Sequence, residues 1–439
     1  MKKILCLFLV AAMTVSLFAA CGQQPAPASS NTPSPSASAP TSSPGEAKPE
    51  EIKGDITFMV IDSFTKSEDA ALYATTKAFM EKYPGIKVTI EPTAATNIKD
   101  KFTTSALSGA GPDIIALDSA GWAVDAAAAN LLAPLDKELG PIKDQFNEGP
   151  LNSALYNGNH YAVPWYMNNM GMFYNKKILA DAGVDKVPAT WAEFTDALTK
   201  VGNAGKKGII LPFFFPSYVM YAFYYQNGNP VIDTSGGKPV STLMTDSGKE
   251  AFNYLAELHT KYKAFPESTK DAMSWDQTYA PFIQEEVAFL FCGDWANWAL
   301  KDSGIDYGIA PLPVGKQPAT VLGGYTLSIN KNTASYDAAW KYIEWLTAKE
   351  QNDVLLSYGR VGARKDIDSA ALIKQAPHLE QFISQNSYTM ARPSIVKLAE
   401  FDDMFANAYK QVILNAKTAE EALNELDAKV NAFLAKEYK

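Results

Sequence analysis

Aromatic and acidic side chains stand at the ends of several strands predicted from apolar runs in this sequence. Aromatic rings bind the apolar face of a flat polar ligand such as a sugar ring, and carboxylates accept hydrogen bonds from the hydroxyl groups at its edge. This combination of residue types suits the binding of a small polyhydroxylated molecule. The candidate side chains that follow predicted strands are Phe64, Asp118, Ser119, Asp294 and Trp295.

The sequence contains no pattern typical of a catalytic site. Glu285 and Glu286 are the acids considered for glycoside hydrolysis, but as chain neighbours they point in different directions. Gly-x-Ser-x-Gly, His-Glu-x-x-His and phosphate-binding glycine motifs are all absent. A binding protein is therefore predicted, without a cofactor. A surface glycoside hydrolase and an adhesion or scaffold lipoprotein are the alternatives from other classes.

Potential metal ligands are sparse. His160, His259 and His378 are far apart and have no metal-ligand spacing. Tyr224-Tyr225 resembles the adjacent tyrosine pair of ferric-ion binders, but it lies in an aromatic stretch predicted to be helical, so packing is the expected role. Cys292 lies in an apolar strand and is expected to be a small buried residue. The sequence therefore predicts no metal site.

Predicted strands and helices alternate along the chain. This alternation is typical of an α/β sheet with parallel strands and helices on its faces. In such sheets ligands bind beyond the carboxyl ends of the strands, where the candidate side chains stand. Strands are predicted at 56–61, 86–90, 114–117, 170–174, 287–291, 306–310 and 324–329, and the longer helices at 72–83, 98–107, 217–227, 246–262, 275–284, 334–347, 395–414 and 418–437.

The first twenty residues predict a secretory signal. Two lysines precede an apolar run that ends in Phe18-Ala19-Ala20, directly before Cys21. A cysteine after two small residues resembles a bacterial lipobox, which implies cleavage before Cys21 and its lipidation. An uncleaved anchor and an ordinary signal with an incidental cysteine are the alternatives, although the run is shorter than the roughly 20 residues that a membrane-spanning helix needs.

Residues 21–50 are rich in Pro, Ser, Ala and Thr and contain no aromatic residue. Such a segment buries too little apolar surface to fold, so we expect a disordered, extended tether. Residues 51–439 are enough for two domains. The chain has a formal net charge of −9, which argues against nucleic acid or an anionic membrane surface as a partner.

Several short sequence blocks follow one another in a characteristic order along the remaining chain. They are Phe79-Met80-Glu81-Lys82-Tyr83-Pro84-Gly85-Ile86-Lys87-Val88, Gly111-Pro112-Asp113-Ile114, Asn130-Leu131-Leu132-Ala133-Pro134-Leu135-Asp136, Tyr161-Ala162-Val163-Pro164-Trp165, Phe173-Tyr174-Asn175-Lys176, Val187-Pro188-Ala189-Thr190-Trp191, Tyr307-Gly308-Ile309-Ala310-Pro311-Leu312-Pro313 and Gly323-Gly324-Tyr325-Thr326-Leu327-Ser328-Ile329. In this order and spacing they resemble the extracellular solute-binding proteins of ABC importers, in the family that includes the maltose-binding type. The resemblance covers about residues 52–437. Glu285-Glu286 and Ala363 depart from the family pattern, at positions that affect loops.

The resemblance implies an α/β, two-lobe periplasmic-binding-protein fold of type II, with a ligand cleft between lobes joined by crossover strands. We predict an N-terminal lobe of residues 51–165 plus 328–370 and a C-terminal lobe of residues 166–327 plus 371–439. The lobes would close on the ligand by hinge motion. Closure reports binding only if the ligand contacts both lobes.

The same resemblance adds candidate ligand contacts to those at the strand ends. It places Trp165 and Tyr166 at the first crossover, Gly324 and Tyr325 at the second, and Arg392 in a loop at the cleft. It also gives Trp295 a stacking position. Each of these residues has a packing or structural alternative. The complete predicted site is Phe64, Asp118, Ser119, Trp165, Tyr166, Asp294, Trp295, Gly324, Tyr325 and Arg392.

The resemblance implies a lipid-anchored, monomeric receptor on the outer face of the bacterial cytoplasmic membrane. It would capture a sugar or oligosaccharide and deliver it to ABC permease subunits, with ATP hydrolysis in a separate subunit and no reaction of its own. The aromatic content of 12% favours a sugar. The alternative is the same scaffold binding a glycerol phosphodiester, a polyamine or a metal ion.

Overall fold

The computed structural model describes residues 52–66, 70–95, 97–118, 121–213, 216–269 and 274–438. The predicted signal, Cys21, the predicted tether and Ser119 lie outside the described residues. Residues 51–439 form one compact unit. Within the described ranges, no helix combines the length and the apolar character needed to cross a membrane.

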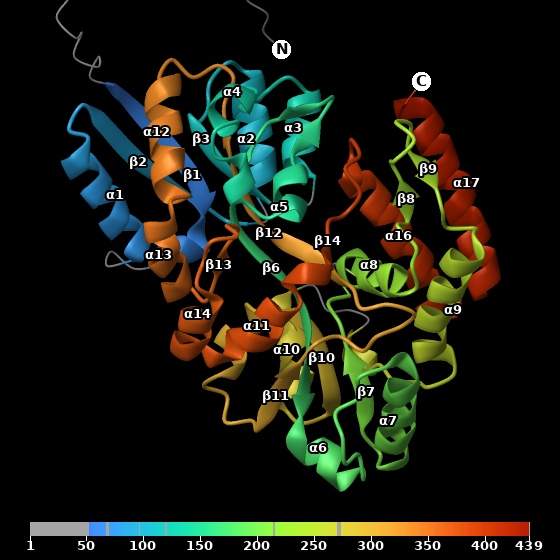
Figure 1. Cartoon of the computed structure of the whole chain (residues 1–439). Helices are drawn as coiled ribbons and strands as arrows, with labels where there is room; N and C mark the ends of the chain where they lie inside the picture. Colours follow the sequence, from blue (N-terminus) through green and yellow to red (C-terminus); the bar gives the residue numbers. More distant parts are fainter. Residues whose placement is uncertain are drawn as a thin grey trace, which may run out of the picture. The chain divides into compact units, whose positions relative to one another are not determined.

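The first part of the unit is built on a mixed sheet with the strand order β2-β1-β3-β12-β6 (Figure 1). β1 pairs in parallel with β2 and with β3, as the alternation of strands and helices predicts. β12 is antiparallel to both β3 and β6. The bounds are β1 Gly54–Ile61, β2 Ile86–Thr93, β3 Ile114–Asp118, β6 Val163–Asn175 and β12 Thr320–Ile329.

Helices cover this sheet and bury one face each. Leu72, Thr76 and Phe79 share the buried face of the first helix, and the Phe79 ring lies 4.9 Å from that of Tyr342 on α12. Helices and short elements of this part are η1 Asp62–Phe64, α1 Ala71–Lys82, α2 Ile98–Leu107, α3 Trp122–Ala128, α4 Asp136–Leu139, η2 Lys143–Gln145, α5 Glu148–Asn152, β4 Leu155–Tyr156, β5 Asn159–His160, α12 Tyr336–Leu346, η4 Lys349–Gln351 and α13 Asn352–Ser357.

The second part continues from β6 through antiparallel β10 to β7, and β11 also pairs with β6. Side-chain caps start several of its helices: Thr190 accepts a hydrogen bond from the Glu193 amide, and Thr418 forms a capping box with Glu421. Its elements are α6 Lys176–Asp181, α7 Trp191–Asn203, β7 Lys207–Ile210, α8 Pro216–Gln226, β8 Ile232–Asp233, β9 Val240–Ser241, α9 Asp246–Thr260, η3 Glu267–Thr269, α10 Trp275–Ile283, β10 Val287–Gly293, α11 Ala296–Leu300, β11 Tyr307–Ala310, α14 Ser369–Gln375, η5 Pro377–Leu379, α15 Glu380–Ser384, η6 Asn386–Tyr388, β14 Thr389–Met390, α16 Leu398–Ile413 and α17 Ala419–Glu437.

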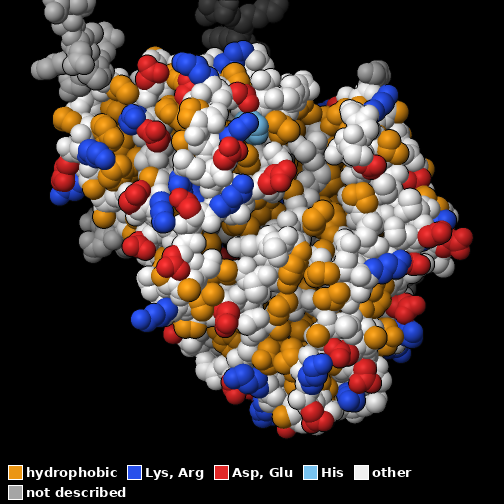
Figure 2. All heavy atoms as spheres, in the orientation of Figure 1, with side chains coloured by type: hydrophobic (Ala, Val, Ile, Leu, Met, Phe, Trp, Pro, Cys, Tyr) orange, Lys and Arg blue, Asp and Glu red, His pale blue; other side chains and the backbone are white. Residues whose placement is uncertain are grey.

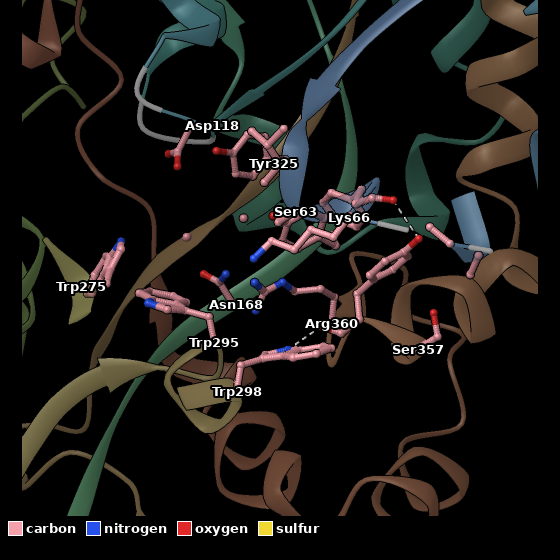
Figure 3. A pocket seen from close by; sticks show the side chains of 18 of the residues that line it. Ser63, Lys66, Asp118, Asn168, Trp275, Trp295, Trp298, Tyr325, Ser357 and Arg360 are labelled. Carbon is pink, nitrogen blue, oxygen red and sulfur yellow. Dashed lines mark hydrogen bonds between the residues drawn. The ribbon is translucent and has the colours of Figure 1, made fainter. Parts of the chain in front are cut away.

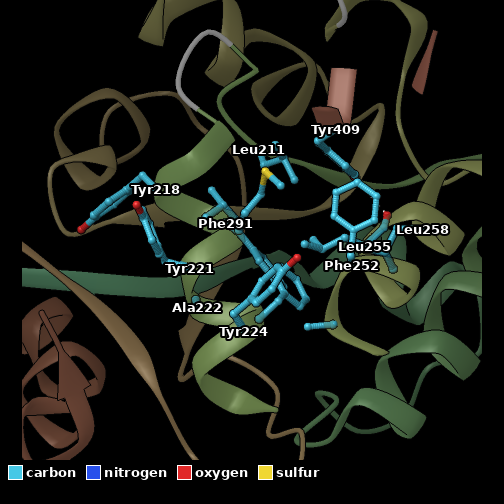
Figure 4. Close-up of a cluster of buried hydrophobic side chains, with 14 of the residues drawn as sticks. Leu211, Tyr218, Tyr221, Ala222, Tyr224, Phe252, Leu255, Leu258, Phe291 and Tyr409 are labelled. Atoms are coloured by element: carbon cyan, nitrogen blue, oxygen red, sulfur yellow. Dashed lines mark hydrogen bonds between the residues drawn. The ribbon is translucent and has the colours of Figure 1, made fainter. Parts of the chain in front are cut away.

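Helix α8 lies entirely inside this second part, with every one of its residues buried. Figure 4 shows its tyrosines among side chains of β10, α9 and α16. Tyr224 packs against Phe405 with ring centroids 5.2 Å apart, and the Tyr225 hydroxyl donates to the Ala391 carbonyl at 2.9 Å. The adjacent tyrosines therefore pack in a core, as the sequence predicts. Cys292 in β10 is also fully buried.

Strand β6 belongs to both parts. Its residues 163–169 pair with β12, and its residues 170–174 pair with β10. Met167 packs in the first core, whereas Met170 packs in the second. We call the part around the first core the N-terminal lobe and the part around the second the C-terminal lobe. The lobe bounds given from the sequence remain a prediction.

Two more segments run between the lobes. In β12, Val321 packs in the core of the C-terminal lobe and its neighbour Leu322 in that of the N-terminal lobe. The short strand β13 Val361–Gly362 pairs with β6 at Met167 and Tyr166, and Val361 packs in a buried cluster with Phe173 of β6 and Leu290 of β10. The lobes are thus joined by paired strands, which fix where the facing surfaces meet.

Candidate functional site

A cavity of about 760 Å³ lies where the two lobes face each other. Figure 3 shows Asp118 and Tyr325 on one side of it and Trp295, Trp298 and Arg360 on the other. In the space-filling view, hydrophobic side chains gather along the middle of the face and charged ones lie mostly around them (Figure 2). The lining residues are Ile61, Ser63, Phe64, Lys66, Ala70, Ala71, Asp118, Tyr166, Asn168, Tyr218, Trp275, Tyr279, Trp295, Trp298, Gly323, Gly324, Tyr325, Ser357, Tyr358, Arg360 and Arg392.

The wall from the N-terminal lobe forms at the carboxyl ends of its parallel strands. Phe64 follows β1, and Asp118 is the last residue of β3. Tyr325 of β12 lies opposite Asp118 on one side and opposite Tyr166 on the other. The rings of Tyr166 and Tyr325 stack with centroids 5.6 Å apart. Strand pairing therefore places two tyrosines and a carboxylate on one surface.

Gly324 permits this close pairing of β12 with β6. Its φ is +119°, and a Cβ atom there would lie 2.2 Å from the Tyr166 carbonyl oxygen. Any other residue would be strained in this backbone conformation and would collide with β6. Gly324 therefore shapes the wall through its backbone.

The wall from the C-terminal lobe is built from tryptophans and tyrosines. Trp295 follows β10, and its ring lies 5.3 Å from that of Trp275 at an angle of 73°. The Tyr218 ring lies 6.1 Å from Trp295 on another side. Trp298 is 53% exposed, and its Nε1 donates to the Tyr358 carbonyl across the cavity mouth at 3.2 Å. Rings in different orientations thus present both faces and edges to the cavity.

Two ion pairs form part of the walls. Arg392 Nη2 donates to Asp118 Oδ1 at 2.9 Å, and Arg360 Nη1 donates to Asp294 Oδ1 at 2.8 Å. Asp294 is only 2% exposed. This burial raises the pKa of Asp294 to about 6, although the nearby Arg360 guanidinium lowers it. The charges of Asp118, Arg392 and Arg360 are therefore balanced by partners, and aromatic side chains are the most frequent kind in the lining.

Asn168 supplies a buried acceptor at the cavity wall. It lies in β6, lines the cavity and is 9% exposed. Its Oδ1 atom accepts no hydrogen bond from the residues that the structure describes. A buried acceptor left without a donor costs free energy, and a ligand hydroxyl or amide that reached this atom would remove that cost.

Seven of the predicted site residues line the cavity. They are Phe64, Asp118, Tyr166, Trp295, Gly324, Tyr325 and Arg392. Asp294 lies behind the wall, where it holds Arg360. Trp165 does not line the cavity; it is 3% exposed and packs on Phe64 with ring centroids 4.8 Å apart. Its position is that of a core residue beneath the wall.

Sequence reasoning missed several lining residues. Trp298 stands one helical turn after Trp295, a spacing that places both on one side of a short helix. Asn168 stands beside Asn169 in a stretch that does not look like a strand, so no local pattern marks it as a lining residue. Trp275 and Arg360 carry no such signal, because their partners Trp295 and Asp294 come from other parts of the chain.

The chain is similar in sequence to proteins of one known family. The sequence model described as bacterial extracellular solute-binding protein matches residues 63–353. A maltotriose-binding protein of Pyrococcus abyssi is 24% identical over 355 residues, covering 78% of this chain and 74% of that protein. A maltooligosaccharide ABC transporter solute-binding lipoprotein of Streptococcus pneumoniae R6 is 26% identical over 357 residues, covering 79% and 82%.

Solved structures show the same fold. Maltose-bound MalE3 of T. maritima superposes with a TM-score of 0.73 at 24% identity, covering 86% of this chain and 99% of that one. The type II two-lobe architecture implied by the sequence blocks is therefore confirmed. At 24% identity this similarity shows the fold alone. The residues that line the cavity of this chain determine what it can bind.

Proposed function

Because this chain belongs to the family of bacterial extracellular solute-binding proteins, we propose that it captures a sugar or oligosaccharide between its lobes and delivers it to an ABC permease. The observation that carries this proposal is the aromatic lining, which comes from both lobes. Nine of the 21 lining residues are Phe, Tyr or Trp. A ligand held by rings of both lobes favours their closed arrangement.

The polar groups of the cavity suit the edge of a sugar ring. Asn168 Oδ1 is an acceptor, Arg360 a donor, and Asp118 and Ser63 lie at the cavity surface. Sugar hydroxyls both donate and accept, so this mixture can be satisfied around one ring. The cavity volume of about 760 Å³ is within the usual range for small-molecule sites.

Malto-oligosaccharides are the first ligands to test. Two relatives are named for maltotriose and for maltooligosaccharides. Their identity to this chain is 24% and 26%, so the sugar, its length and its linkage are open within the proposal.

The receptor would act outside the cytoplasm, held by lipid on Cys21 and the tether at 21–50. The lipoprotein name of the Streptococcus relative supports this anchor. We infer a monomer that docks on permease subunits whose partner ATPase hydrolyses ATP. The receptor itself belongs to a family of binding proteins, and we expect no reaction in the cavity.

A thermal-shift screen of the full chain tests this proposal. The panel contains glucose, malto-oligosaccharides and other saccharide series, with glycerophosphodiesters, polyamines and ferric ion as competing classes. A ligand that binds the folded state alone raises the melting temperature with concentration. We expect a rise with at least one saccharide series. A rise with a polyamine or ferric ion and none with any sugar would contradict the proposal.

A further inference from the structure

The tripeptide Asn-Gly-Asn occurs twice in this chain, at residues 157–159 and 227–229, and these positions hold its only Asn-Gly pairs. An asparagine before a glycine is open to attack by the glycine backbone nitrogen, because glycine has no side chain to hinder the approach and adopts a wide range of backbone angles. The attack succeeds only where the side-chain amide and the nitrogen are both free to move. The two copies therefore form a matched pair that differs mainly in its folded surroundings.

The first copy lies in the exposed turn of a short hairpin. Asn157 and Gly158 connect β4 to β5 with φ angles of +49° and +80°, the left-handed angles that this kind of two-residue turn needs. Both residues are exposed, and a Cβ atom at Gly158 would meet nothing within 4 Å. No backbone carbonyl of the described residues accepts a hydrogen bond from the Gly158 N–H. Each strand pairs through only two residues, so the turn opens locally at small cost.

The second copy directly follows helix α8 and is held by hydrogen bonds. Asn227 is 4% exposed, and its Nδ2 donates to the Ser247 carbonyl at 2.7 Å and to Glu250 Oε2 at 3.1 Å. The Gly228 N–H donates to the Tyr225 carbonyl at 3.0 Å. Bringing the Gly228 nitrogen to the Asn227 side chain would break these hydrogen bonds, and groups left unsatisfied in a buried place cost free energy. The fold therefore opposes the attack at this copy.

We propose that Asn157 is a site of spontaneous deamidation in the folded protein and that the fold protects Asn227 from the same reaction. In the first step the Gly158 nitrogen loses its proton to solvent base and forms a bond to Asn157 Cγ, and the side-chain nitrogen leaves as ammonia. The product is a five-membered succinimide ring. Water then opens either of the two carbonyl–nitrogen bonds of the ring, which leaves aspartate or isoaspartate at position 157. Water is the only co-reactant, and nothing is oxidised or reduced.

The reaction would change the turn in two ways. It replaces a neutral amide with a carboxylate, and the isoaspartate form also lengthens the main chain by one atom, which does not fit a two-residue turn. The same hairpin contacts the C-terminal lobe, because the Leu155 carbonyl accepts from the Ser394 hydroxyl at 3.1 Å. The modification would therefore occur beside the boundary between the lobes. The inference goes beyond the proposed function, since it holds whatever the ligand is.

Peptide mass spectrometry of the full chain, aged without ligand in weakly alkaline buffer, tests this proposal. Digestion at intervals gives separate peptides for Asn157 and Asn227, and each shows deamidation as a small fixed gain in mass. A parallel sample aged in denaturant exposes both copies and gives their rates without the fold. Asn157→Gln is the control variant, because its longer side chain would have to form a six-membered ring, which closes far more slowly.

We expect Asn157 to convert many-fold faster than Asn227 in the folded chain, and the two to convert at similar rates in denaturant. In Asn157→Gln the gain in mass at position 157 should disappear, while Asn227 behaves as in the wild type. Equal rates at the two positions in the folded chain, or no conversion at position 157, would overturn the proposal. So would an excess at position 157 that is as large in denaturant, since the fold would then not be its cause. Because no sugar is used, failure here leaves the proposed sugar binding standing.

Discussion

At the scale of single residues, Trp295 lines the cavity with an indole ring on which a sugar can stack. Trp295→Ala should lower ligand affinity at least about tenfold, because it removes a large apolar ring from the wall. Titration calorimetry with the saccharide found by screening measures the effect. The melting temperature of the ligand-free protein should change by only a few degrees, since Trp295 is partly exposed.

Trp340→Ala is the matched control for this change, because Trp340 lies on α12 and does not line the cavity. It should leave affinity unchanged. Wild-type affinity in Trp295→Ala would show that this ring does not contact the ligand.

Asn168 gives a prediction in which affinity and stability respond differently. Asn168→Ala removes the buried Oδ1 that has no partner among the described residues. The free energy of unfolding without ligand should stay the same or rise, because an unsatisfied buried acceptor is lost. The free energy of ligand binding should become less favourable by roughly 1 kcal/mol, the usual contribution of one hydrogen bond. Lower stability together with normal affinity would mean that Asn168 has a structural role only.

Asp402 should make the free energy of unfolding increase as the pH falls. Burial raises its pKa to about 6, although Arg392 and the Tyr221 hydroxyl lower it. Because the folded pKa exceeds that of the unfolded chain, the folded state binds more protons between about pH 4 and 6, and stability from this group rises as pH falls through 6. Denaturant unfolding of wild type and Asp402→Asn checks this.

The advantage of wild type over Asp402→Asn in free energy of unfolding should increase by about 1 kcal/mol between pH 7 and pH 5. A pH-independent difference would show that Asp402 has an ordinary pKa in the folded protein.

Residue types at strand ends predict much of the site from the sequence alone. Phe64, Asp118 and Trp295 lie at or just beyond the ends of strands, where ligand sites of α/β sheets lie. Arg360 is not predicted, because its partner Asp294 lies 66 residues away in sequence. The prediction that Trp165 contacts the ligand follows from its place at the first crossover, which the resemblance implies, but alternation along β6 directs this ring into the core.

At the scale of elements, the joint between β6 and β12 depends on one glycine. Gly324→Ala should lower the free energy of unfolding by about 2–4 kcal/mol, since it adds a backbone collision to an unfavourable φ. Gly236→Ala is the control, because a Cβ there meets nothing within 4 Å. Denaturant unfolding compares the two. Equal stability would mean that β6 and β12 can separate without cost.

Local patterns predict most helices and strands, but not the full strand that links the lobes. Helix α2 matches its predicted range of 98–107, because its apolar residues repeat at helical spacing. The sequence predicts β6 from residue 170, whereas the strand begins at Val163. Its first half contains Pro164 and polar Asn168 and Asn169, which do not look like a buried strand. Pairing with β12, distant in sequence, stabilises it.

At the scale of the whole molecule, two lobe cores and paired crossover strands enclose one aromatic cavity. The order of sequence blocks predicts this architecture, since it reflects the whole chain rather than one motif. The ligand is not predicted in the same way, because it is determined by which side chains of the two lobes meet. Which side chains face each other depends on the pairing of β6 with β12 and on the ion pairs Arg392–Asp118 and Arg360–Asp294.

Titration calorimetry of the full chain against glucose, maltose and longer malto-oligosaccharides tests the central claim most directly. We predict saturable binding of one saccharide per chain, with affinity rising with length until the cavity of about 760 Å³ is filled, and loss of most of that affinity in Trp295→Ala. No heat with any saccharide, or binding that Trp295→Ala leaves unchanged, would contradict the claim that this cavity is a sugar site.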